Sequence, residues 1–157
     1  MQKINPFMWF DHEAEEAATF YVSLFEGSAI TDVSRYLEGS PGHAGTVMSV
    51  TFRLAGQEFI ALNGGPQFSF NQAISFLVHC EDQAEVDRLW DAFGHGGDPQ
   101  RCGWISDRFG VTWQIVPNAL GDLLGDPDPA RAQRAMQAML QMGKIDIEGL
   151  RRAADGA

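Results

Sequence analysis

The chain has 157 residues, the size of one globular domain or of two small modules that share a core. Apolar residues make up 45% and charged residues 20%, which is typical of a folded protein and excludes overall disorder. The 11 basic and 21 acidic residues give a net charge of −10, which repels phosphate backbones and anionic lipid. We therefore expect no nucleic-acid partner and no membrane partner.

The sequence shows no membrane span, signal peptide or disulfide framework. No apolar run approaches the roughly 20 residues that span a bilayer, and the N-terminal MQKINPFMWFDHE has no small-residue cleavage site. Cys80 and Cys102 are too few for a disulfide framework and form no CxxC pair, so we expect buried or half-buried reduced thiols. Together these features predict a cytoplasmic protein.

The first part of the chain predicts one strand, one helix and three further strands. Residues 4–10 form an apolar, aromatic-rich run typical of a strand, and residues 12–25 carry apolar side chains at helical spacing. Gly27 is expected to end that helix. The further strands are expected at 30–37, 46–54 and 58–63, with a glycine-rich loop at 38–45 and a turn at 55–56.

The second part predicts a similar order of elements. The segment GGPQFSFN, at 64–71, is typical of a linker. Beyond it we expect a strand at 73–80, a helix at 82–94, and a hairpin formed by 101–107 and 111–116. Asp128 followed by Pro129 predicts the start of a final helix that runs to about Met142, and the tail holds at most one more short helix.

This order suggests a duplication. A shift of 69 residues lays residues 7–10 over 76–79, and a shift of 54 lays residues 56–59 over 110–113. We predict an α+β fold of tandem βαβββ modules, in a single domain. Its parts are module 1–64, linker 65–71, module 72–118 and a C-terminal helical segment 119–157.

Five segments of the chain resemble the PhnB-like family. They are PFMWFDHEAEEAATFYVSLF, FIALNGGP, AISFLVHCEDQAEVDRLWDAF, CGWISDRFGVTWQIVP and DPDPARAQRAMQAMLQMGKIDI, and the resemblance covers about residues 3–148. Members of this family are often labelled 3-demethylubiquinone 3-methyltransferase-like. They belong to the vicinal oxygen chelate superfamily of glyoxalases, bleomycin-resistance proteins and extradiol dioxygenases. The resemblance implies curled sheets that enclose a cleft, and a homodimer.

Metal enzymes of this superfamily take ligands from the first and last strand of each module. Laid on this sequence, those positions fall on Asn5 or Pro6, Ile60 or Ala61, Ser75, and Gln114. Only Gln114 is a plausible ligand, and Glu58 lies two residues from its position. The four histidines show no HxH or i, i+4 spacing. We therefore predict no metal and no cofactor.

Strand alternation selects the side chains that face the implied cleft. The candidates are Asn5, Phe7, Trp9, Ser75, Leu77, His79, Trp104 and Gln114. Their aromatic, apolar and neutral polar character suits an uncharged or aromatic ligand. The alternative is that these side chains fill a core. The methionine stripe of the final helix likewise predicts either packing on its own domain, which we favour, or a partner surface.

Two functions remain open. The first is metal-independent binding of a small molecule. The second is an uncharacterised enzyme of lyase, transferase or dioxygenase type, acting through Gln114, Ser75 or His79, or through a metal held in an unusual way. Methyl transfer is disfavoured, because the first strand leads into Asp11-His12-Glu13 rather than into a glycine-rich turn.

Overall fold

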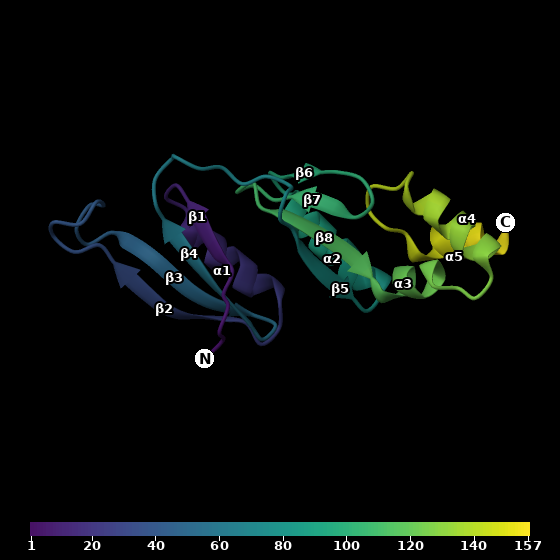
Figure 1. The fold of residues 1–157 in the computed structure, drawn as a ribbon, viewed down its shortest axis with the longest axis horizontal. Helices are drawn as coiled ribbons and strands as arrows, with labels where there is room; N and C mark the ends of the chain where they lie inside the picture. Colours follow the sequence, from purple (N-terminus) through teal and green to yellow (C-terminus); the bar gives the residue numbers. More distant parts are fainter. The chain divides into compact units, whose positions relative to one another are not determined.

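A computed structural model describes residues 1–157, which divide into two compact units, Met1–Ser69 and Phe70–Ala157. Figure 1 labels the helices and strands of each unit. The first contains, in chain order, β1 (Phe7–Phe10), α1 (Ala14–Leu24), β2 (Ala29–Arg35), β3 (Val47–Leu54) and β4 (Gln57–Asn63). Its four strands form one sheet, sheet A, in the order β1-β4-β3-β2. The β1–β4 pair is parallel and the other two pairs are antiparallel.

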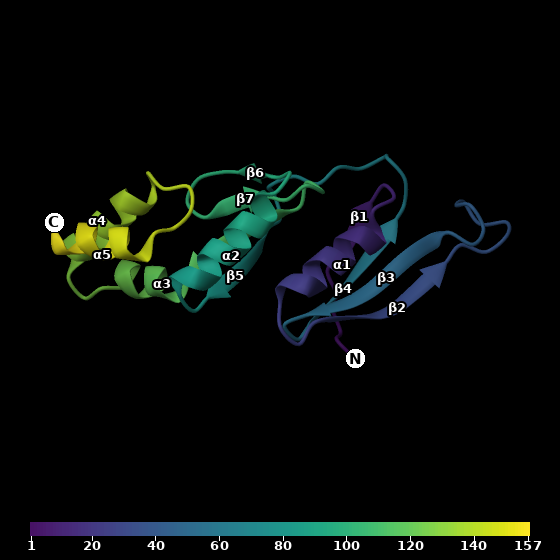
Figure 2. The ribbon, with the colours of Figure 1, turned by 180° about the vertical axis from the view of Figure 1, so that it is seen from behind.

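Helix α1 packs on one face of sheet A, as Figure 2 shows from the side on which α1 is in front. Alternation along the strands places the core on that face, where Met8, Phe10, Val50, Phe52, Phe59 and Ala61 are buried. The helix contributes small residues and Tyr21, so helix and sheet approach closely. No side chain of the helix caps its start; the Oδ1 atom of Asn63 accepts a hydrogen bond from the Ala14 N–H at 2.8 Å instead.

The second unit begins with β5 (Phe76–Cys80), α2 (Gln83–Gly94), β6 (Asp98–Pro99), β7 (Trp104–Ser106) and β8 (Thr112–Pro117). These strands form sheet B in the order β5-β8-β7-β6, again with a parallel pair of first and last strands. The shared order confirms the predicted duplication of a βαβββ module and the α+β fold. Helix α2 packs against β7 and β8, and the Phe93 ring stacks on Trp113 with centroids 4.7 Å apart.

Three helices follow sheet B: α3 (Asn118–Leu124), α4 (Pro129–Met139) and α5 (Ile147–Asp155). The sequence analysis missed α3, and α4 ends three residues before the predicted Met142. The predicted cap of α4 is confirmed: Asp128 accepts a hydrogen bond from the Ala130 N–H at 3.0 Å, and Pro129 opens the helix. The methionine stripe is divided, because Met139 packs on the Leu120–Ile145–Leu150 cluster whereas Met136 is 47% exposed.

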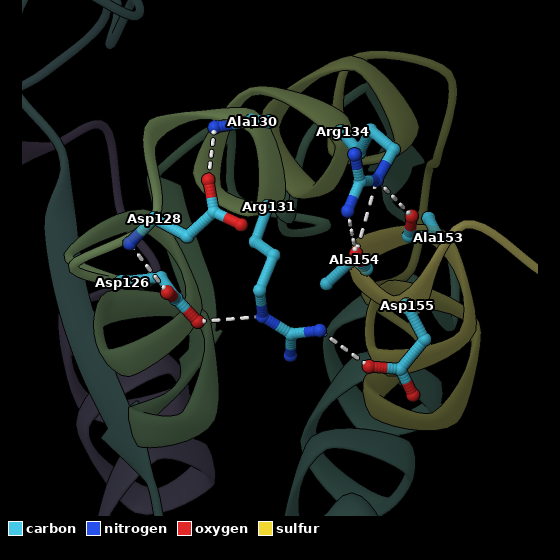
Figure 3. Close-up of polar contacts among 8 residues, drawn as sticks. All are labelled: Asp126, Asp128, Ala130, Arg131, Arg134, Ala153, Ala154 and Asp155. Carbon is cyan, nitrogen blue, oxygen red and sulfur yellow. Dashed lines mark hydrogen bonds and ion pairs between the residues drawn. The ribbon is translucent and has the colours of Figure 1, made fainter.

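Two arginines of α4 hold α5 (Figure 3). Arg131 donates to Asp126 at 2.9 Å and to Asp155 at 2.6 Å. Arg134 donates to the carbonyl oxygens of Ala153 and Ala154 in the last turn of α5. Both cationic side chains of α4 are therefore used within the helical segment.

The chain after α4 is tied back to the second module. The N–H groups of Cys102 and Gly103 donate to the carbonyls of Met142 and Gly143, and the Gln83 side chain bonds the backbone of Ile145 and Ile147. Gly103 has a φ of +83°, and a Cβ there would lie 2.8 Å from the Ile115 carbonyl, so only glycine fits. No helix is long and apolar enough to cross a membrane.

Candidate functional site

Each sheet has a face on which its own helix does not pack, called here its open face. On sheet A it carries Asn5, Phe7 and Trp9 from β1 and the residues before it, Glu58, Ile60 and Leu62 from β4, and Ser49, Thr51 and Arg53 from β3. The parallel register sets Phe7 beside Ile60 and Trp9 beside Leu62, which makes an apolar strip along β1 and β4. Phe7 is 59% exposed, an unusual state for an aromatic side chain within a strand.

Trp9 lies at the end of this strip and is half-buried. Its Nε1 atom donates to the Gly65 carbonyl at 2.9 Å, and its ring meets Phe68 edge to face at 4.9 Å. A Cβ at Gly64 would lie 2.3 Å from the indole, so the absence of a side chain there lets the ring lie flat on the backbone. One side of Trp9 is thus fixed by residues 64–68.

Asn5 bonds a residue that the sequence analysis set aside. Its Nδ2 atom donates to Oε1 of Glu58 at 3.0 Å. Because Phe7 pairs with Ile60, the residue beside Asn5 in the parallel register is Glu58, two residues before Ile60. Glu58 therefore places a carboxylate on the open face of sheet A. The sequence signal for it is that Glu58 and Ile60 are two residues apart on one strand, so their side chains point to the same face.

The open face of sheet B carries the other five predicted residues. Leu77 is 44% exposed and His79 is exposed, whereas the adjacent Cys80 is buried on the α2 side, as alternation predicts. Gln114 lies between Leu77 and Trp104 in the register and donates from Nε2 to the Ser75 Oγ at 2.9 Å. Apart from His79, the other four side chains of this group, Ser75, Leu77, Trp104 and Gln114, are uncharged.

A chain of neutral polar groups continues along sheet B. Gln100 donates to the Ser106 hydroxyl at 2.8 Å, and that hydroxyl lies 3.2 Å from the Thr112 hydroxyl. Asp107 begins the turn that joins β7 to β8 and is 4% exposed. It accepts hydrogen bonds from the N–H groups of Phe109 and Val111 and from Nε1 of Trp113, at 2.9 to 3.0 Å. This carboxylate therefore holds the hairpin that positions Trp104 and Gln114.

The first unit also contains a cleft of about 650 Å³, which none of the eight predicted residues lines. It is bordered by the start of α1, the loop between β2 and β3, and the end of β4. Its lining residues are Asp11, His12, Glu15, Glu16, Tyr36, Pro41, Gly42, His43, Thr46, Val47, Asn63, Gly64 and Gly65. Tyr36 closes one wall, since its hydroxyl donates to the Asn63 carbonyl and its ring lies against Gly42.

The donors for a metal are sparse. No group of three or more His, Cys, Asp and Glu side chains is arranged to hold an ion. The Cys80 thiol does not supply a ligand readily, because burial and the nearby Glu85 raise its pKa to about 12. Both cysteines are free, with Cys80 buried and Cys102 half-buried, as predicted. The residues present do not fit the four-ligand site of the superfamily's metal enzymes.

The comparisons with known proteins agree on a family. A sequence model of the 3-demethylubiquinone-9 3-methyltransferase family matches residues 2–116. The match stops short of residue 148, to which the resemblance in the sequence extends, so α3, α4 and α5 lie beyond it. None of the curated proteins compared with the chain matches it.

Several solved structures are similar to this chain. The PhnB protein from Bacillus cereus is 38% identical over 74% of this chain and 99% of its own, with a TM-score of 0.69. Protein PA1353 from Pseudomonas aeruginosa is 22% identical over 74% of this chain and 98% of its own, with a TM-score of 0.61. A glyoxalase/bleomycin resistance protein from Albidiferax ferrireducens is 13% identical, over 71% of this chain and 95% of its own, with a TM-score of 0.45. The family match and the Bacillus relative confirm the resemblance in the sequence: the chain belongs to the PhnB-like, 3-demethylubiquinone-9 3-methyltransferase family.

Proposed function

We propose that this protein binds an aromatic small molecule on the open faces of its sheets, without a metal and without catalysis. The observation that carries the proposal is the exposure of apolar side chains at strand positions, Phe7 on sheet A and Leu77 on sheet B. Apolar walls with a few fixed polar groups are the usual composition of a ligand site. Trp9 and Trp104 add flat surfaces, and the Ser75–Gln114 pair adds neutral hydrogen-bonding groups.

The chemistry of the available donors supports the proposed metal independence. On sheet A, Asn5 lies beside Glu58, and that carboxylate already accepts a hydrogen bond from the amide of Asn5. On sheet B the pair is Ser75 and Gln114, a hydroxyl and an amide, which are weak ligands for a divalent transition metal.

Methyl transfer, which the family name suggests, is not proposed for this chain. A nucleotide-derived cofactor needs a glycine-rich turn where its backbone can approach the ligand. The turn from β1 to α1 is Asp11-His12-Glu13 instead, and its carboxylates repel anions.

An enzyme acting through Ser75, Gln114 or His79 is the second candidate. In the structure Gln114 donates its hydrogen bond to the Ser75 oxygen, so it does not act as a base toward that hydroxyl. His79 lies on the same face, and its imidazole is exposed to solvent. This placement keeps His79 as the residue on which an enzymatic alternative rests.

A thermal-shift screen with aromatic compounds tests the proposal, because a ligand at 100 times its Kd stabilises the folded state by about 2.7 kcal/mol. Phe7→Ala and Leu77→Ala should weaken the shift with little effect on folding. Leu37→Ala removes an apolar side chain that is 77% exposed outside both open faces and is the matched control. If all three variants respond as the parent does, the open faces are not the site. Stoichiometric metal in tag-free protein would overturn the metal-free proposal.

Assembly and location remain part of the proposal. We expect a cytoplasmic homodimer, on the basis of the family resemblance, in which a second copy covers part of the exposed apolar surface. Light scattering that reports a monomer at every concentration would contradict the dimer.

A further inference from the structure

The open face of sheet A differs from that of sheet B in one respect: it carries a half-buried carboxylate. Glu58 lies on β4 beside Asn5, and its side chain is on the same face of the sheet as that of Ile60, two residues further along the strand. Its Oε1 atom accepts the Asn5 amide at 3.0 Å, and both the N–H and C=O of its backbone bond the side chain of Gln2. The residue is therefore fixed at both its backbone and its carboxylate.

The fixed orientation points the carboxylate toward β1. Arg53 is opposite Glu58 in the antiparallel register of β3 and β4, yet no ion pair joins the two side chains. Asn5 holds the carboxylate on the β1 side instead, where Phe7 is its exposed neighbour on the same face. A carboxylate has room for about four hydrogen bonds, so acceptor capacity remains after Asn5 has bonded.

An anion at the end of an aromatic and aliphatic strip is complementary to one kind of ligand. The anion attracts a protonated nitrogen and accepts its N–H groups, and the exposed face of Phe7 attracts the same cation through its ring. Ile60, Leu62 and Trp9 continue the strip and suit the apolar body of the molecule.

We propose that sheet A selects aromatic amines, with Glu58 as the anchor for the protonated nitrogen and Phe7 beside it. The proposal rests on the proposed function, because it assumes that the open face binds a small molecule at all. It adds the charge of the ligand and the residue that recognises this charge. Asn5 acts as the positioning residue that keeps Glu58 directed at the strip.

Three indole probes separate charge from shape: tryptamine, 3-methylindole and indole-3-propionate. Their Kd values are measured by NMR titration at low ionic strength, where exposed charges are least screened. We expect tryptamine to bind about fivefold to tenfold more tightly than neutral 3-methylindole, as an exposed ion pair with a cation–π contact would give. Indole-3-propionate should bind most weakly.

Matched variants locate the effect. Glu58→Gln should abolish the preference for tryptamine and leave 3-methylindole binding unchanged, while retaining an acceptor for Asn5. Glu26→Gln makes the same charge change at an exposed position away from the strip, and it controls for general attraction to the acidic chain. Arg53→Gln removes a competing cation, so the tryptamine affinity should hold or rise.

The outcomes distinguish the two levels of the proposal. Equal affinity for tryptamine and 3-methylindole would overturn the amine proposal and leave the proposed function standing. Loss of the preference in Glu15→Gln but not in Glu58→Gln would also overturn it, and would place the amine in the acidic cleft. If none of the three probes binds, the proposed function itself fails.

Discussion

The buried contact between Asp107 and Trp113 gives the sharpest test of how the second module is held. Oδ1 of Asp107 accepts two backbone N–H groups of its own turn, and Oδ2 accepts the indole Nε1–H at 2.9 Å. Asp107→Asn keeps one oxygen for the turn but sets an amide NH₂ against the indole N–H. Two donors then face each other in a buried place, which should cost about 2–3 kcal/mol of unfolding free energy.

The companion change is Trp113→Phe. It leaves Oδ2 without its indole partner and shrinks a buried ring that stacks on Phe93, at a cost of about 2–3 kcal/mol. In the double variant the opposed donors are gone, so the loss should fall short of the sum of the single losses. We expect a coupling energy of about 1–2 kcal/mol, within the range found for residues in direct contact.

Urea unfolding followed by far-UV circular dichroism measures the stability of the parent, the two single variants and the double variant. This signal does not depend on the tryptophan fluorescence that Trp113→Phe changes. Asp98→Asn, at an exposed position of β6, is the control and should change stability by less than about 0.5 kcal/mol. Single losses that add within about 0.5 kcal/mol would show that Asp107 and Trp113 act independently, and would refute the reasoning.

Three further predictions concern other parts of the chain. Trp9→Ala should lower the free energy of unfolding, measured with urea, by about 2 kcal/mol, because the ring is only partly buried and has one hydrogen bond. A loss above about 3 kcal/mol would show that Trp9 is a core residue rather than a site residue. A thiol reagent at pH 8 should label half-buried Cys102 in the native protein and Cys80 only after unfolding, because burial raises the pKa of Cys80 to about 12; equal labelling rates would contradict this. By NMR titration the pKa of Asp126 should lie below 3.8, because the Asp128 N–H and then Arg131 favour its charged form. Its contribution to stability is then present above pH 3.8 and lost as the pH falls, and an unshifted value in the parent protein would count against the contact.

Local signals in the sequence explain which elements could be predicted. The Ala55-Gly56 turn, with φ values of +47° and +88°, and the Asp128 cap each depend on a few adjacent residues. Helix α3 lacks such signals: it starts directly after Pro117, spans only 7 residues and has no side-chain cap. Its stability comes from packing on Ile145 and Leu150, which lie far along the chain.

The position of Glu58 shows a second limit. Strand alternation assigned residues to faces, and a two-residue slip between β1 and β4 leaves every side chain on its face. Alternation therefore does not tell which residue of β4 lies beside Asn5, and in the structure that residue is Glu58. Only the pairing of strands more than 50 residues apart reveals the neighbour, and that pairing is set by tertiary structure.

The open faces also show why the sequence alone did not decide which face of a sheet forms the core and which forms the candidate site. Met8 and Phe10 share one parity with each other, and Phe7 and Trp9 share the other, so alternation alone makes either face a core. The choice is made by α1, which packs on the face of sheet A that carries Met8 and Phe10 and leaves Phe7 largely in water. Fully burying such a side chain is worth about 1.5–3 kcal/mol, and folding of the first unit leaves much of that unrealised at Phe7. A ligand or a second copy that covers Phe7 recovers it on binding, which is the physical reason to look for the occupant on this face rather than in the acidic cleft.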